Sequence, residues 1–290
     1  MQKIIPHLWF DHEAQQAVEF YLSAFGEESK ITGRTILPNT PSGDTEVLSF
    51  LLAGYEFMAI NAGPLVQFNP SISFHVYGRT REEVDLLWNR LGEGGTPLMN
   101  LDSYPFNERF GWLQDRYGLS WQIMLNKEAD IQKIVPALMF TGDMYGKAEE
   151  AIRFYVSIFG NTRIHNITRY QRGEDPDVEG AVKQSTFELE GQTFVAMESA
   201  YEHGFSFNES ISLMVYCENQ EEIDYYWDRL SAVPEAEECG WLKDQYGLSW
   251  QIVPRQMNDL MYSSDEEKRN QLVQGMLKMK KWDITKLENA

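Results

Sequence analysis

The chain has 290 residues, of which 43% are hydrophobic and 24% charged, and its 44 acidic and 25 basic side chains give a net charge of −19. This length favours two domains, and the acidic excess argues against binding to nucleic acids or anionic membranes, because both require basic surface. No apolar run is long enough for a membrane span, no signal peptide is evident, and the only cysteines are Cys217 and Cys239. We therefore expect a cytoplasmic protein, with a single Cys217–Cys239 disulfide left open.

The first 60 residues predict a β-α-β-β-β unit. Residues 3–10 alternate as a strand does, with His7 and Trp9 on one face. Asp11 is the expected N-cap of a helix that stops at Gly26. Three further strands are expected over residues 30–37, 46–52 and 55–60, with a loop over residues 38–44.

A second unit of the same order follows. It comprises a strand over residues 71–77, a helix over 81–91, a weak strand near 96–100 and a hairpin centred on Asp115–Gly118. Thr80 and Glu83 have the spacing of a capping box at the start of the helix. Strand periodicity places Trp121 on one face of the last strand and Gln122 on the other.

The second half of the chain repeats the first. Residues 240–252 match residues 111–123 at eleven of thirteen positions, so the chain is an internal duplication. Residues 131–254 then form the second domain, after a first domain over residues 1–126 and a short linker. Residues 255–290 form a helical tail, in which Ser264 or Asp265 caps a helix over 266–281 and Asp283 caps a short last helix.

Three motifs carry a resemblance to a known family. They are Gly-Trp-Leu-x-Asp-x-Tyr-Gly-Leu-Ser-Trp-Gln-Ile, the helix end Phe-Tyr-x-Ser-x-Phe-Gly, and Glu-Glu-x-Asp-x-x-Trp-x-Arg-Leu. Residues 1–254 resemble two tandem copies of the PhnB-like branch of the vicinal oxygen chelate superfamily, a branch often labelled 3-demethylubiquinone-9 3-methyltransferase-like. The superfamily includes glyoxalase I, bleomycin-resistance proteins and extradiol dioxygenases. The resemblance implies an α+β fold, in which tandem βαβββ units form two glyoxalase-like half-open barrels, with the helical tail added.

The same resemblance implies that helices cover the convex face of each barrel, so that Trp121 faces the helices, and that ligands bind on the concave face. Strand parity then gives a set of pocket candidates in the first half: His7, Trp9, Ser49, Ser71, Ser73, His75, Tyr77, Trp112 and Gln122. The equivalent candidates in the second half are Met139, Thr186, Ser212, Trp241 and Gln251.

Metalloenzymes of the superfamily bind a divalent metal with histidine and glutamate on these strands, and this chain departs from that pattern. By the resemblance, the glutamate of the last strand is replaced by Gln122 and Gln251. The other expected ligands match Ser71, Ser210, Ser49 and Thr186, and the opening strand offers His7 in the first half but Ala137 in the second. Neutral amide and hydroxyl oxygens are weak ligands for transition metals, so we predict no metal ligands and no cofactor. The alternative is a divalent metal in the first half, held by His7 and His75.

No catalytic residue can be assigned from the motifs. The chain lacks the glycine-rich strand-to-helix turn of a methyl-donor site, and no nucleophile motif surrounds its serines. The favoured prediction is metal-independent binding or sequestration of a small molecule in the first-half concavity. The alternative is a divergent metal-dependent lyase, isomerase or dioxygenase, and a structural or regulatory protein is a third. Whether the chain is an enzyme stays open.

The duplication also predicts how the halves associate. Single-repeat proteins of the branch are generally homodimers, so the resemblance implies that the two halves imitate that dimer within one chain. We expect a pseudo-two-fold relation between residues 1–125 and 131–253, without nucleic-acid or membrane partners. Assembly into a further homo-oligomer is not determined by the sequence.

Overall fold

The computed structural model describes residues 2–26, 28–128, 131–257 and 266–288. The first half contains β1 (Ile4–Phe10), α1 (Ala14–Phe25), β2 (Lys30–Thr40), β3 (Gly43–Leu52), β4 (Tyr55–Asn61), β5 (Ile72–Gly78), α2 (Arg81–Leu91), β6 (Thr96–Tyr104), β7 (Asn107–Gln114) and β8 (Ser120–Leu125). The predicted order of elements is confirmed.

The second half repeats this order with a shorter last segment. It contains β9 (Ile134–Phe140), α3 (Ala148–Ile158), β10 (Arg163–Arg169), β11 (Val182–Leu189), β12 (Gln192–Glu198), β13 (Ile211–Cys217), α4 (Gln220–Leu230), β14 (Trp241–Lys243) and β15 (Ser249–Pro254), with short 3-10 turns at Gly142–Met144 and Pro234–Ala236. The tail contributes α6 (Glu266–Met276) and α7 (Ile284–Glu288).

Two local predictions were wrong. Asp11 does not cap α1, whose N-cap is Glu13 without a side-chain hydrogen bond. The backbone N–H of Ala14 instead donates to Asn61 Oδ1 at 2.8 Å, so a residue at the end of β4 satisfies the helix terminus. The loop predicted over residues 38–44 is mostly strand, because β2 and β3 extend toward a tight turn in which Thr40 Oγ1 donates to the Gly43 carbonyl at 2.7 Å.

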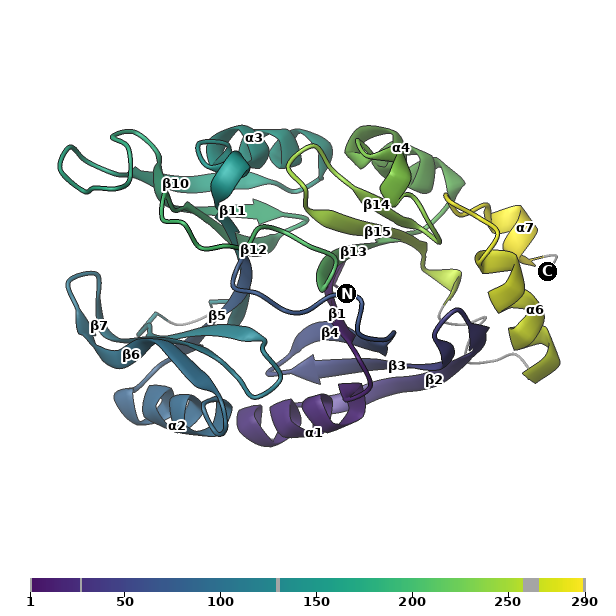
Figure 1. The fold of residues 1–290 in the computed structure, drawn as a ribbon, viewed down its shortest axis with the longest axis horizontal. Coiled ribbons are helices and arrows are strands. Elements are labelled where there is room, and N and C mark those ends of the chain that lie inside the picture. The colour runs from purple at the N-terminus through teal and green to yellow at the C-terminus, as the bar shows by residue number, and fades with distance from the viewer. Residues whose placement is uncertain (1, 27, 129–130, 258–265, 289–290) are drawn as a thin grey trace.

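Each of the two sheets contains strands from both halves. One has the order β14-β15-β13-β1-β4-β3-β2, and the other has the order β10-β11-β12-β9-β5-β8-β7-β6. The halves meet where β1 pairs antiparallel with β13 and where β5 pairs antiparallel with β9. We call the concave side of the first sheet cup A and that of the second sheet cup B. Figure 1 shows α1 and α2 along one outer side of the molecule and α3 and α4 along the opposite side.

The registers of the two junctions are equivalent. His7 lies opposite Ser212 in one sheet, and Ala137 lies opposite Ser73 in the other. Exchanging the two halves therefore converts one sheet into the other, and the chain is an intrachain pseudo-dimer. The prediction of a concavity built by the first half alone was wrong, because both cups are lined by strands of both halves.

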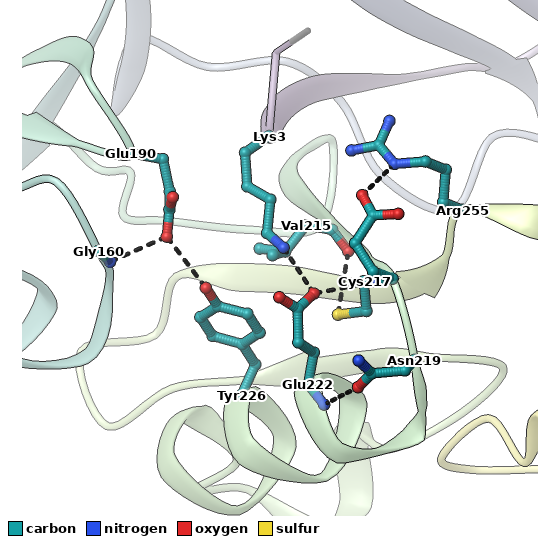
Figure 2. Close-up of polar contacts among 10 residues, drawn as sticks. Lys3, Gly160, Glu190, Val215, Cys217, Asn219, Glu222, Tyr226 and Arg255 are labelled. Atoms are coloured by element: carbon teal, nitrogen blue, oxygen red, sulfur yellow. Dashed lines mark hydrogen bonds and ion pairs between the residues drawn. The ribbon is translucent and has the colours of Figure 1, made fainter.

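An ion pair and side-chain hydrogen bonds connect the start of the chain to the second half. Lys3 Nζ lies 2.7 Å from Glu222 Oε2, at the start of α4, as Figure 2 shows. The Gln192 side chain accepts from the Ile4 backbone N–H at 2.8 Å and donates to the Ile4 carbonyl at 2.8 Å. An equivalent ion pair joins Lys133 to Glu83 at the other junction. The junction is therefore specified by side chains as well as by the backbone ladder.

The duplicated motif, residues 111–123 and 240–252, forms buried hydrogen bonds and packs against the helices. Asp244 Oδ2 accepts from Trp250 Nε1 and from the Tyr155 hydroxyl, both at 2.8 Å, while its Oδ1 accepts from the backbone of the following turn. Asp115 receives the same bond from Trp121 Nε1 at 2.8 Å. Trp121 packs against the α1 side chains, with its ring centroid 5.5 Å from that of Tyr21. The prediction that Trp121 faces the helices is confirmed.

The tail lies at one end of the molecule, beside the sheet of cup A (Figure 1). Asn39 Nδ2 donates to Asn270 Oδ1 at 3.1 Å, which joins β2 to α6. The helix ends at Met276 rather than at the predicted residue 281, and its predicted caps Ser264 and Asp265 lie outside the described residues. Asp283 Oδ1 accepts from the backbone N–H of Lys286 at 3.1 Å, as expected for the cap of α7.

Two further predictions concern cysteine pairing and membrane spans. Cys217 and Cys239 are both free, so they do not form the disulfide that the sequence left open. Among the helices that the structure describes, none is long and apolar enough to cross a bilayer.

Candidate functional site

A cavity of about 590 Å³ occupies cup A. Its floor combines β1, β3 and β4 of the first half with β13, β14 and β15 of the second half, and the tail forms a further wall. Most of the lining is apolar, and representative members are Val47, Met58, Ile60, Met214, Val273 and Met276. A concave, mostly apolar cavity with a few polar groups is the usual form of a small-molecule site.

Three aromatic rings meet on one wall of this cavity. The Trp241 ring lies edge-on to His7, with centroids 5.7 Å apart, and edge-on to Trp9, with centroids 5.9 Å apart. Trp9 is held by a hydrogen bond from its Nε1 to the Gly63 carbonyl at 2.8 Å. This wall therefore joins β1 of one half to β14 of the other.

Three buried polar atoms of the lining residues lack a protein partner among the described residues. They are Nδ1 of His7, Oγ of Ser249 and Nε1 of Trp282, of which the last is packed against Gly240. Burial lowers the pKa of His7 to about 3, so its imidazole is neutral near pH 7. Leaving a buried polar atom unpaired costs roughly 1–3 kcal/mol, so His7 Nδ1 and Ser249 Oγ are available to a ligand.

The amide that replaces the expected glutamate makes a hydrogen bond with a serine. Gln251 Nε2 donates to Ser212 Oγ at 2.9 Å in cup A, and Gln122 Nε2 donates to Ser73 Oγ at 2.9 Å in cup B. Within the part of the chain that the structure describes, no three His, Cys, Asp or Glu side chains cluster as metal ligands would. A neutral amide that points its N–H₂ group at a serine does not fit the superfamily metal.

The structure divides the predicted pocket residues between the two cups. His7, Trp9 and Ser49 lie in the sheet of cup A, together with Ser212, Trp241 and Gln251 of the second half. Four of these line the cavity: His7, Trp9, Trp241 and Gln251. The other candidates belong to the sheet of cup B or to the residues beside it, namely Ser71, Ser73, His75, Tyr77, Trp112, Gln122, Met139 and Thr186. Grouping the first-half residues into one pocket was therefore wrong.

Cup B differs from cup A at its centre. The buried residues Val135, Ala137 and Val195 form an apolar cluster there. His75 lies beside this cluster, with Nδ1 3.5 Å from the Tyr77 hydroxyl and with burial lowering its pKa to about 4. The duplication thus supplies two cups of one design whose linings have diverged.

Sequence reasoning missed two groups of lining residues. Met58 and Ile60 alternate on β4 and could have been found from strand parity. The tail residues Val273, Met276 and Leu277 line the cavity as well, but their periodicity predicts only packing and not its location.

Cys239 is the cysteine among the described lining residues, and its surroundings keep its thiol protonated. Burial raises its pKa to about 11, and its Sγ donates to the Met276 carbonyl at 3.5 Å. A protonated thiol is a poor nucleophile, so this arrangement favours binding over covalent chemistry.

Two solved structures illustrate what this chain is similar to. A putative 3-demethylubiquinone-9 3-methyltransferase, PhnB protein, from Bacillus cereus is 39% identical over 43% of this chain and 100% of its own, with a TM-score of 0.40. Glyoxalase I from Zea mays is 13% identical over 87% of this chain and 92% of its own, with a TM-score of 0.57, which shows a shared fold. A search of curated proteins finds no match.

A family model supplies the assignment. The model described as 3-demethylubiquinone-9 3-methyltransferase matches residues 2–124 and again residues 132–253. These two matches cover most of the chain and coincide with the duplication. The protein therefore belongs to the 3-demethylubiquinone-9 3-methyltransferase family, as two tandem PhnB-like domains of the glyoxalase fold.

Proposed function

We propose that the protein binds a small, largely apolar molecule in cup A without a metal ion, and so sequesters it. The main support is that His7 Nδ1 is buried in the lining of a cavity of about 590 Å³ with no partner among the described residues. A ligand that forms a hydrogen bond there relieves the cost of the unpaired atom. The surrounding apolar walls then favour burial of the rest of the ligand.

Binding in cup A requires both halves of the chain. His7 and Trp9 come from β1, while Trp241, Ser249 and Gln251 come from β14 and β15. The pseudo-dimer is thus the smallest unit that builds this site, which gives the duplication a functional consequence. The second half contributes a large share of the lining rather than only completing the assembly.

A neutral fluorophore can test this proposal. We expect N-phenyl-1-naphthylamine to bind saturably at one site per chain, with the same affinity before and after dialysis against EDTA. His7→Ala, which places the residue of the equivalent position Ala137 at this site, should weaken binding several-fold. The matched control is His75→Met in cup B, where Met214 is the equivalent residue, and it should leave the affinity unchanged.

Two results would contradict the proposal. The first is the absence of saturable binding to the intact protein. The second is binding that disappears on metal removal and returns with a divalent cation, which would favour the alternative of a divergent metal-dependent lyase, isomerase or dioxygenase.

A further inference from the structure

We infer that cup A selects by charge: it accepts planar aromatic molecules that are uncharged or positively charged and rejects aromatic carboxylates and phosphates. This inference rests on the proposed function of cup A and specifies the class of ligand. It follows from the charges that line the cavity, from the neutral polar groups at its floor and from a difference between the two cups.

The charged residues of the lining are mostly acidic. Among the described residues they are Glu209, Glu235, Glu238 and Lys243. The single ammonium group is already used, because Lys243 Nζ forms an ion pair with Glu209. Glu235 and Glu238 are exposed at the rim, where their negative charge meets an approaching ligand.

Among the residues that the structure describes, the floor of the cup supplies no positive charge. Its polar groups include the neutral imidazole of His7, the Ser249 hydroxyl and the Gln251 amide. The sequence between Met257 and Glu266 contains no lysine, arginine or histidine either. A carboxylate that enters this apolar site would lose its hydration without gaining a cationic partner, and burial of an unpaired charge is strongly unfavourable.

The aromatic part of the inference follows from comparing the cups. In cup B, Trp112 Nε1 donates to Ser120 Oγ at 2.8 Å. The equivalent pair in cup A is Trp241 and Ser249, and there Ser249 Oγ has no partner among the described residues. Trp241 instead contacts the rings of His7 and Trp9, which occupy the positions of Ala137 and Met139 in cup B. The indole therefore presents aromatic surface where its counterpart forms a hydrogen bond with a serine.

Ring surfaces of this kind suit a planar ligand. Offset or edge-to-face contact with Trp9 and Trp241 stabilises an aromatic ring, and tryptophan also attracts cations through its π face. The freed Ser249 hydroxyl and His7 Nδ1 can form hydrogen bonds with one uncharged polar group on the ligand. Both features are compatible with a neutral aromatic alcohol and neither compensates an anion.

Three probes that share one ring system test the inference: 1-naphthalenemethanol, 1-naphthylmethylamine and 1-naphthoate. Titration calorimetry on the full chain at pH 7.5 should show the alcohol and the amine binding within about tenfold of each other. Naphthoate should bind at least tenfold more weakly than the alcohol. Trp241→Leu should weaken binding of the alcohol, and the matched cup B variant Trp112→Leu should not.

A charge reversal at the rim tests whether charge, rather than the shape of the cavity, determines which probe binds. Glu238→Lys should bring the affinity for naphthoate at least threefold closer to that for the alcohol, because the lysine supplies the missing cation. Glu221→Lys is the control: it changes the net charge equally on exposed α4, outside the lining, and should leave the ratio unchanged.

The outcomes distinguish the inference from the proposed function. Naphthoate that binds wild-type protein as tightly as the alcohol does, with the binding weakened by His7→Ala, would overturn charge selection and leave cup A as a binding site. A ratio that responds equally to Glu238→Lys and Glu221→Lys would also overturn it. Failure of all three probes to bind would contradict both.

Discussion

Replacing Gly240 with any residue that has a side chain should destabilise the protein, because Gly240 packs against the ring of Trp282 in the tail. A Cβ at Gly240 would overlap Trp282 Nε1 and would lie 2.7 Å from Trp282 Cδ1 and Cε2. The backbone φ of Gly240 is +82°, a left-handed conformation that strains L-residues. The tail is fixed here by two backbone bonds, since the N–H groups of Cys239 and Gly240 donate to the carbonyls of Met279 and Lys280 at 2.9 and 2.7 Å.

The expected cost of Gly240→Ala has two parts. The left-handed backbone contributes roughly 1–2 kcal/mol. Overpacking against a ring that is 3% exposed contributes about 1–3 kcal/mol more. The free energy of unfolding should therefore fall by roughly 2–5 kcal/mol. Gly247→Ala isolates the first part, because Gly247 has a φ of +83° and no atom within 4 Å of an added Cβ among the described residues.

Urea denaturation of Gly240→Ala, Gly247→Ala, Trp282→Ala and the double variant Gly240→Ala/Trp282→Ala measures the steric part directly. We expect Gly240→Ala to be the more destabilising single change. In the Trp282→Ala background its additional cost should drop to that of Gly247→Ala. Equal costs for the two glycines in the wild-type background would refute the close packing of the tail on β14, and so would a cost that persists without the indole.

The remaining predictions concern pH and the association of the halves. The folded pKa of His7, about 3, lies below its ordinary value of 6.5, so only the unfolded state gains a proton as pH falls through 6.5, and stability is lost. By pH 5 the contribution of His7 to this loss is about 2 kcal/mol, and His75, whose pKa burial lowers to about 4, adds to the loss in every variant. Denaturation curves should therefore show a loss about 2 kcal/mol smaller in His7→Ala than in wild-type protein and in the exposed control His12→Ala. Residues 1–126 alone expose the β1 and β5 edges that pair with β13 and β9, so sedimentation should show a homodimer or a complex with residues 131–290. A stable folded monomer of residues 1–126 would contradict that pairing.

Much of the architecture is local in origin and could be predicted. The alternation of residues 3–10 and the helical spacing before Gly26 predict their elements because each pattern depends on the geometry of one segment. Strand parity placed Trp121 and Gln122 on opposite faces, and the family resemblance identified the face of Trp121 as the one that the helices cover. The departures at Gln122 and Gln251 from the metal ligands of the superfamily were also visible in the sequence.

The sequence by itself therefore determined the duplication, the order of the elements and the face of each strand. Only the tertiary structure decided that β1 pairs with β13 of the second half as well as with β4 of its own half, and hence that the pocket candidates separate into two cups. It also decided that the tail forms a wall of cup A and that Trp241 turns toward His7 and Trp9. The physical reason is that periodicity specifies which side of a segment is buried, whereas the partner that buries it is chosen by long-range packing.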